Sequence, residues 1–283
     1  MLQFCNFAMK LGLIAGNGRF PFLVLAAARG AGHDVTVIAL KTETFPELEA
    51  LAKEPPAAPL HWISIGQLGT CIRLLKEAGV EQAVMAGQVK HTRIFADFMP
   101  DATLLDVLVH LRAKNTDSLI NGVAEALNKH GIQLLDSTTF LQPLMAREGV
   151  LTGRAPYDDE QKDLAFGYKI ADAVAGMDIG QAVAVKSAAV VAVEAMEGTD
   201  ALIARAGQLA GAGVRIVKVA KPNQDMRFDV PVIGVSTIKA MAAIGATTLS
   251  VDAGRTLMID GDEIIKAADE AAIAIVGRAT RPT

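Results

Sequence analysis

The chain has 283 residues, of which 51% are hydrophobic and 20% charged, so it can build a large core and is not an intrinsically disordered protein. Its net charge of -4 comes without a basic block, which excludes a typical nucleic-acid-binding face. Cys5 and Cys71 are far apart and have no metal or redox spacing, which indicates a reducing, cytoplasmic setting. No histidine pair has zinc-ligand spacing, and no transmembrane segment or secretory signal is predicted.

The first predicted unit is a strand at residues 11–15, a glycine loop and a helix at residues 22–31. This order is typical of nucleotide-binding α/β folds, in which backbone N–H groups approach an anion at the helix N-terminus. Gly16, Asn17 and Gly18 are therefore candidate substrate contacts. The dinucleotide fingerprint is incomplete, because its third glycine falls at Pro21 and no acidic residue ends the next strand. A dinucleotide site, a phosphate or nucleotide loop, and an ordinary tight turn all remain open.

Strands continue to alternate with helices along the N-terminal half, which predicts a mainly parallel sheet. Gln67, before a helix at residues 70–78, and Gln88, after a strand at residues 80–86, are further candidate contacts; the alternative for Gln88 is an ordinary loop residue. Asp117 is the expected N-cap of a helix over residues 118–129. The further elements predicted here are strands at residues 34–40, 60–65 and 132–135 and a helix at residues 104–111.

The alternation lapses over residues 136–156, so we expect two α/β domains. The first is a Rossmann-like domain over residues 1–137, and the second is a distinct α/β domain over residues 138–283. In the second we expect Thr199 or Asp200 to cap one helix and Ser236 another. Its predicted helices are residues 158–176, 199–209, 237–244 and 262–272, and its predicted strands are residues 178–185, 188–194, 213–220, 232–235, 248–251, 256–259 and 274–276.

A polar loop over residues 221–229 is the stretch around which we expect the second domain to be organised. It follows the β-branched strand of residues 213–220 and returns directly into the apolar residues 230–234. Polar groups at the mouth of a buried sheet are where α/β proteins usually place their chemistry. The residues concerned are Lys221, Gln224, Asp225, Arg227 and Asp229.

Carboxylates placed at strand and helix ends suggest a metal site. Glu194 ends a strand, Asp200 opens a helix, and Asp225 lies in the polar loop between two cations. Magnesium prefers few protein oxygens, so two or three such groups beside a diphosphate are enough. The structural alternatives are that Asp200 only caps its helix and that Asp229 only pairs with Arg227.

Seven motifs, in order along the chain, match one family pattern: residues 12–21, 66–69, 149–152, 178–183, 193–201, 221–231 and 253–257. Together they resemble the UDP-2,3-diacylglucosamine pyrophosphatases of lipid A biosynthesis, in the form unrelated to the metallophosphoesterase enzymes. The resemblance covers nearly the whole chain. We see no departure from the motifs beyond the extra residues before Lys10.

The resemblance implies a magnesium-dependent hydrolase in which water attacks the α-phosphorus, giving UMP and 2,3-diacylglucosamine 1-phosphate. It also implies two domains with the lipid between them. Asp225 occupies the position of the essential aspartate of the family. Peripheral association with the cytoplasmic face of the inner membrane is expected, and a homodimer is left open.

The expected site therefore has three sets of residues. The catalytic set is Asp225, Lys221 and Arg227; the substrate-binding set is Gly16, Asn17, Gly18, Gln67, Gln88, Gln181, Thr199 and Gln224; and the Mg2+ ligands are Asp225, Glu194 and Asp200. Two other classes stay open: a nucleotide-dependent oxidoreductase built on the Gly16 loop, and a non-catalytic carrier of lipid or nucleotide-sugar.

Overall fold

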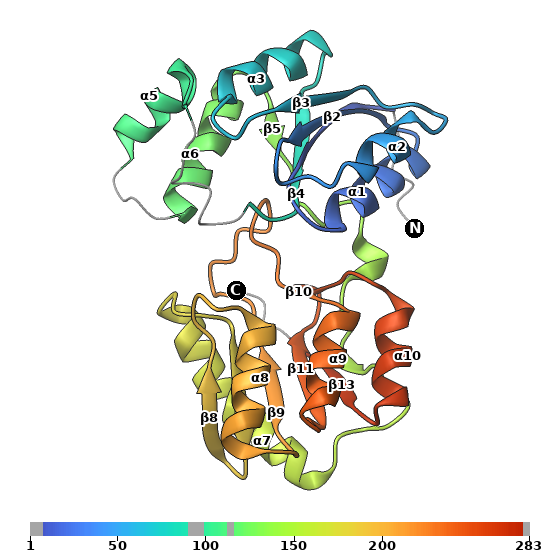
Figure 1. Cartoon of the computed structure of the whole chain (residues 1–283), viewed down its shortest axis with the longest axis vertical. Helices are drawn as coiled ribbons and strands as arrows, with labels where there is room; N and C mark the ends of the chain where they lie inside the picture. The colour runs from blue at the N-terminus through green and yellow to red at the C-terminus, as the bar shows by residue number, and fades with distance from the viewer. Residues whose placement is uncertain (1–7, 90–98, 112–115, 280–283) are drawn as a thin grey trace. The chain divides into compact units, whose positions relative to one another are not determined.

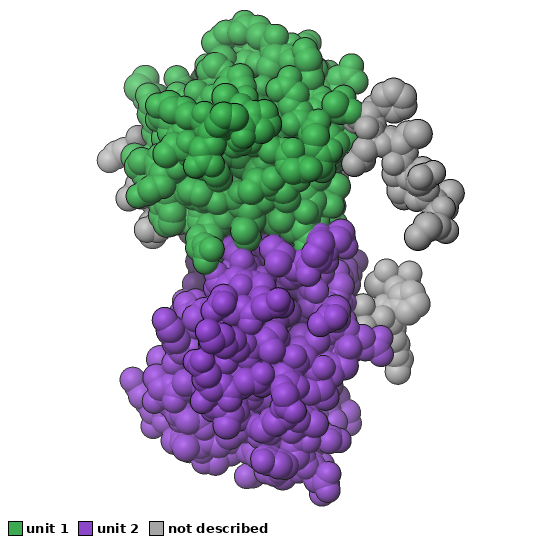
Figure 2. Space-filling view, turned by 90° about the vertical axis from the view of Figure 1, so that its right-hand side faces the viewer, with its two compact units in different colours: residues 1–141, 226–228 green, residues 142–225, 229–283 purple. Residues whose placement is uncertain are grey.

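This computed structural model describes residues 8–89, 99–111 and 116–279. The chain divides into two compact units, one of residues 1–141 with 226–228 and one of residues 142–225 with 229–283 (Figure 2). The predicted α/β class with two domains is confirmed. The sequence suggested a join after residue 137; in the structure the division follows Leu141, and the tip of the polar loop belongs to the first unit.

The first unit is built on a five-stranded sheet with the order β3-β2-β1-β4-β5, and every neighbouring pair is parallel (Figure 1). The mainly parallel sheet predicted from the alternation of elements is confirmed. The strand order reverses between β1 and β4, which is where open α/β sheets usually bind ligands. The strands are β1 (Lys10–Ala15), β2 (Asp34–Leu40), β3 (Leu60–Ile63), β4 (Gln82–Ala86) and β5 (Gln133–Leu134).

Helices of this unit share a buried apolar core with that sheet. A core cluster joins Ile38 of the sheet to Leu75 and Leu127 on two of the helices, all fully buried. The first helix starts two positions earlier than predicted, because Pro21 fits within its first turn, where no N–H is needed. The helices are α1 (Phe20–Gly30), α2 (Glu47–Lys53), α3 (Leu68–Glu77), α5 (Ala102–His110) and α6 (Thr116–Lys129). The predicted cap Asp117 lies outside the residues whose side chains are described.

The second unit contains a six-stranded mixed sheet with the order β6-β13-β11-β9-β7-β8. Its strands β9, β11 and β13 are parallel, whereas β6, β7 and β8 each pair antiparallel with their neighbours. The strands are β6 (Gly149–Val150), β7 (Ala182–Lys186), β8 (Ala189–Val193), β9 (Arg215–Lys218), β11 (Thr248–Asp252) and β13 (Ala274–Arg278). A separate two-stranded parallel sheet joins β10 (Val232–Ile233) to β12 (Leu257–Met258).

Two hydrophobic clusters in this unit contain residues of its large sheet. One includes residues of α7 (Asp158–Gly176), β7 and β9. The larger cluster includes Leu202, Ile238 and Ile264 from three other helices, together with Ile216 of β9. Those helices are α8 (Thr199–Ala210), α9 (Val235–Ala243) and α10 (Asp262–Glu270), and a short 3-10 helix covers Gln142–Leu144. In the part of the chain that the structure describes, no helix is long and apolar enough to cross a membrane.

Two predicted helix caps are wrong. Helix α8 begins at Thr199 after Gly198, which has a φ of 85°, so neither Thr199 nor Asp200 is the cap. Helix α9 begins at Val235, which places Ser236 inside its first turn. In both cases a glycine precedes the helix and leaves the polar side chains free for longer-range contacts.

Strands β7 and β8 form an antiparallel hairpin, and its turn is stabilised by a side chain from elsewhere in the unit. Ser187 and Ala188 have φ values of 52° and 56°, which non-glycine residues rarely adopt. The buried carboxylate of Asp163 on α7 accepts both turn N–H groups, at 2.9 and 2.6 Å. A helix side chain therefore stabilises the strained turn.

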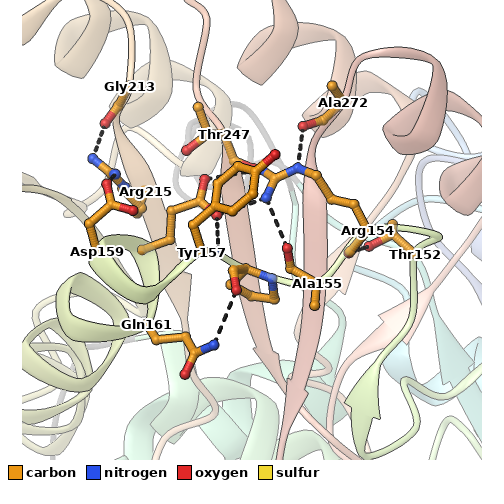
Figure 3. A network of polar contacts seen from close by, with 12 residues as sticks. Thr152, Arg154, Ala155, Tyr157, Asp159, Gln161, Gly213, Arg215, Thr247 and Ala272 are labelled. Carbon is orange, nitrogen blue, oxygen red and sulfur yellow. Dashed lines mark hydrogen bonds and ion pairs between the residues drawn. The ribbon is translucent and has the colours of Figure 1, made fainter.

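A buried ion pair joins the segments that precede the parallel strands (Figure 3). Both terminal nitrogens of Arg154 bond Glu160, which is 2% exposed, at 2.8 and 3.0 Å. Arg154 also donates to the carbonyls of Ala272 and Thr247, just before β13 and β11. Burial alone would raise the pKa of Glu160, but hydrogen bonds, first of all from Arg154, lower it to about 2. The pair therefore connects α7 to the amino ends of two core strands.

We predict that this pair makes the protein less stable as the pH falls. The folded pKa of Glu160 lies below the unfolded value of about 4.3, so its contribution is complete above that pH and is lost as pH falls towards 2. Glu160→Gln should lower the free energy of unfolding at pH 7 by about 3 kcal/mol. The free energy of unfolding of this variant should also change less with pH between about pH 4.3 and 2. Urea midpoints across this range measure both effects, and an unchanged acid slope would contradict the assignment.

Candidate functional site

Several charged and polar residues of the second unit lie at the edge of the sheet where the parallel strands end. Lys218, Asp252 and Arg278 are the last residues of β9, β11 and β13. The antiparallel strand β7 begins at the same edge, because Ala182 lies opposite Lys218, and β8 ends there. Gln181 and Glu194, which flank these strands, are therefore brought to the edge from which the polar loop departs.

Lys218 is a site residue that the sequence reading missed. It donates to the hydroxyl of Thr199 at 2.9 Å and to the carbonyl of Val232 at 3.0 Å. Burial lowers the pKa of Lys218, although Glu194, Asp200 and Asp229 oppose the change. Its position in the sequence could have indicated this role, because it is a charged residue at the carboxyl end of an otherwise buried strand.

Glu194 is buried in a network of predicted substrate contacts. One of its oxygens accepts from the Thr199 hydroxyl at 2.8 Å and the other from the Gln181 N–H at 3.1 Å. The side chain of Gln181 in turn donates to Gln224 at 2.7 Å. The structure therefore brings together four residues that the sequence indicated separately.

Gln224 organises the polar loop from the inside. It is 8% exposed, and its carbonyl oxygen accepts from the Lys221 N–H at 2.7 Å as well as from Gln181. Its amide donates to the backbone oxygen of Asp229, and the Asp229 N–H donates to the Asp225 carbonyl at 2.9 Å. Asp225, which follows Gln224 and is half-buried, therefore lies in a backbone turn closed from both sides.

The charged side chains near Asp225 form ion pairs and hydrogen bonds with several different groups. The Lys221 ammonium lies 2.6 Å from Asp178 and 3.4 Å from Asp229. Asp200 accepts from the Thr237 hydroxyl at 3.3 Å, so this exposed carboxylate bonds to another helix. The pairing of Lys221 with Asp229 adds a second closure to the loop.

The tip of the loop is bonded within the first unit. The buried Ser137 donates its N–H to the Met226 carbonyl at 2.9 Å, and its hydroxyl lies 2.6 Å from the carbonyls of both Arg227 and Met85. The Arg227 guanidinium lies over the Phe228 ring, 5.7 Å from its centre. Ser137, which the sequence reading missed, thus positions the backbone of a predicted catalytic arginine.

The predicted magnesium ligands do not form a ready-made cage. Throughout residues 8–89, 99–111 and 116–279, no group of three or more histidine, cysteine, aspartate or glutamate side chains is placed to hold a metal ion. Glu194 and Asp200 both lie in the electrostatic field of Lys218.

In the first unit, the Gly16 loop pairs with the loop that follows β4. The N–H groups of Gly16 and Asn17 donate to Ala86 and Gln88, at 2.8 and 2.7 Å, and Gln88 returns a bond to Asn17 at 3.2 Å. The backbones approach so closely that a Cβ on Gly16 would lie 2.7 Å from the Gln88 oxygen. Two N–H groups that an anion would need are thus already used. The glycine pattern is explained by the packing of one loop on the other.

Gln67 and Cys71 both have roles within or beside helix α3: one bonds the backbone directly before it, and the other is buried in it. The Gln67 side chain accepts from the Ser64 N–H at 2.8 Å, directly before α3. Cys71 lies within α3 and is 3% exposed, and burial raises its pKa to about 12. Such a thiol is not a reactive nucleophile.

Comparison with known proteins gives the family. Models of the LpxI N-terminal domain and the LpxI C-terminal domain match residues 10–144 and 147–276. The chain belongs to the LpxI family. A relative from Caulobacter vibrioides, UDP-2,3-diacylglucosamine pyrophosphatase LpxI, is 32% identical over 280 residues, which are 95% of this chain and 97% of the relative. The resemblance found in the seven motifs is therefore confirmed.

One solved structure is also similar, but only weakly. It is the Bordetella bronchiseptica enzyme WbmG in complex with NAD, which is 21% identical and covers 46% of this chain and 37% of its own. The TM-score is 0.29, so this likeness carries no argument about fold or ligand.

The close approach of the two loops in the first unit can be tested with a matched pair of glycines. Gly18 and Gly87 have the same φ of 89°, so alanine is equally strained at both. A Cβ on Gly18 would meet open space, whereas one on Gly87 would lie 2.4 Å from the Asn17 oxygen. We expect Gly87→Ala to cost about 1 to 3 kcal/mol more than Gly18→Ala in urea unfolding. Equal costs would contradict the packing explanation.

Proposed function

We propose that this chain hydrolyses the diphosphate of UDP-2,3-diacylglucosamine, giving UMP and 2,3-diacylglucosamine 1-phosphate. Membership of the LpxI family makes the chain a hydrolase of a pyrophosphate bond, as predicted. The observation that carries the proposal is the loop after β9, in which Gln224 and the pair of Lys221 with Asp229 hold Asp225 in a closed turn.

Water attacks the α-phosphorus in the proposed reaction. A bond forms between the water oxygen and that phosphorus, and the bond from the phosphorus to the bridging oxygen breaks. The bridging oxygen leaves with the sugar phosphate, and one water proton passes to a base. Asp225 is the proposed base or water-orienting group, because it is half-buried and its backbone is fixed.

Positive charge for the leaving phosphate comes from Lys221 and Arg227 in this proposal. Gln181, Thr199 and Gln224 lie in or beside the network that supports the loop and are proposed to contact the substrate. When bound with the diphosphate, Mg2+ would neutralise its oxygens and acidify a water, with Asp225 as the protein ligand. A substrate with two acyl chains also supports peripheral attachment to the cytoplasmic face of the inner membrane; a homodimer remains part of the proposal.

The oxidoreductase alternative has less support in this structure. Such an enzyme would use the backbone N–H groups of the Gly16 loop for a pyrophosphate, and those of Gly16 and Asn17 already bond to the neighbouring loop. A non-catalytic carrier would tolerate the loss of Asp225. Turnover by variants of the polar loop therefore separates the three classes.

We predict that Asp225→Ala lowers kcat by about a hundredfold or more, the scale for a positioned acid–base group. The melting temperature should hardly change, because substitutions in partly exposed loops usually cost about half a kcal/mol. Asn223→Ala, an exposed position in the same loop, is the matched control and should retain turnover. Near-normal turnover of Asp225→Ala would contradict the role, and a collapsed melting point would make Asp225 structural.

Hydrolysis in water enriched in oxygen-18 tests the direction of attack. Attack at the α-phosphorus places the heavy oxygen in UMP, whereas attack at the β-phosphorus places it in the sugar phosphate. Mass spectrometry of both products should therefore find the label in UMP. The same assay after treatment with EDTA, with and without added Mg2+, tests the metal requirement; full activity in EDTA would remove magnesium from the proposal.

A further inference from the structure

The last residues of β11 and β13 form a buried ion pair beside the root of the polar loop. Asp252 and Arg278 are register partners across the two strands, and Asp252 is 2% exposed. The Arg278 Nε donates to Asp252 Oδ1 at 2.7 Å. Burying this carboxylate would be expensive without such a partner.

The second oxygen of Asp252 bonds the backbone that leads into the loop. Asp252 Oδ2 accepts the N–H of Ala220 at 2.8 Å, and Ala220 directly precedes Lys221. The ladder between β9 and β11 ends at the pair of Lys218 with Val251. Beyond the end of the ladder, the Asp252 carboxylate, instead of a backbone carbonyl, therefore accepts the N–H of Ala220. Hydrogen bonds to a charged group are stronger than those between neutral groups.

Arg278 is itself fixed from a third direction. Its terminal nitrogens bond both oxygens of Asp172 on α7, at 2.9 and 2.8 Å, and its guanidinium lies over the Tyr168 ring at 4.7 Å. The Tyr168 hydroxyl bonds Ser250 of β11. Burial would lower the pKa of Arg278, but the bonds to Asp172 and Asp252 outweigh it, so the cation that faces Asp252 is permanent.

We propose that Asp252 and Arg278 are positioning residues for hydrolysis: they fix the backbone at Ala220 and thereby set where the loop presents Asp225. This inference rests on the proposed function, since it assigns a task to the loop that carries the chemistry. Neither residue needs to touch the substrate. A small displacement at the root is carried to Asp225, and about 1 Å of misplacement can cost a hundredfold in rate.

The chain contains a matched control at the other end of the same strands. Arg154 and Glu160 also form a buried pair, but Arg154 bonds to the carbonyls of Thr247 and Ala272, which precede the strands (Figure 3). Both pairs connect α7 to the sheet, one directly through Glu160 and the other through Asp172. They differ in that one of them bonds the root of the polar loop.

The first test compares Asp252→Asn with Glu160→Gln. Asparagine keeps the shape of Asp252 but faces one of its two donors with an NH2 group. We expect kcat to fall about tenfold or more with KM within about twofold, because placement of the reacting group is lost while substrate binding stays. Glu160→Gln should keep the wild-type kcat when assayed below its melting temperature. Amide hydrogen exchange of a peptide over residues 219–229 should rise in Asp252→Asn alone.

Arg278→Lys provides a second variant should Asp252→Asn fail to fold. Lysine keeps the charge but lacks the planar guanidinium that bonds Asp252 and Asp172 through three nitrogens, so kcat should fall, whereas Arg154→Lys should leave it unchanged. A wild-type kcat in folded Asp252→Asn or Arg278→Lys, or equal losses in the control variants, overturns the proposal. If the wild-type chain does not cleave the UDP-sugar, the proposed function fails, and hydrogen exchange still decides whether Asp252 anchors the loop.

Discussion

Charge at the carboxyl edge of the second sheet must be paired, and this requirement shapes the surroundings of the loop. Lys218, Asp252 and Arg278 end the parallel strands β9, β11 and β13 with ionisable side chains that are partly or wholly buried. Unpaired, each would cost several kcal/mol. Their partners come from α7, from the start of α8 and from the backbone of the loop itself. Satisfying these charges therefore fixes the segment that carries Asp225.

The two units use different means to hold their loops. In the first, backbone pairs with backbone, and glycines at Gly16 and Gly87 permit an approach that any side chain would block. In the second, side chains do this work: Gln224 fills the inside of the loop and Asp252 bonds its root. A side-chain frame can place a reacting group with a defined direction, which is what proton transfer requires.

Much of this arrangement follows from local sequence. Alternating elements predicted the parallel sheet, and polar residues after buried strands indicated Glu194 and the loop with Gln224. Gln181 and Thr199 lie in motifs of the family resemblance and were expected as substrate contacts together with it. Short-range patterns predicted the starts of helices less well. The N-caps of α8 and α9 are Gly198 and Gly234, whereas Thr199 or Asp200 and Ser236 were expected.

Other residues were missed because their roles depend on contacts far along the chain. Asp252 and Arg278 read as ordinary strand ends until the register places them together beside Ala220. The roles of Lys218 and Ser137 likewise depend on distant contacts: Lys218 bonds Thr199, and Ser137 bonds the backbone at the tip of the loop. The pairing of Gly16 with the loop after β4 likewise joins segments that no local pattern connects.

The central claim is that the loop after β9 carries the chemistry. A crystal structure of the Asp225→Asn variant with uncleaved UDP-2,3-diacylglucosamine tests it most directly. The account predicts that the diphosphate contacts residue 225 and the neighbouring side chains of the polar loop. A diphosphate bound at the amino ends of the strands, beside Arg154, or anywhere out of reach of residue 225, would contradict it.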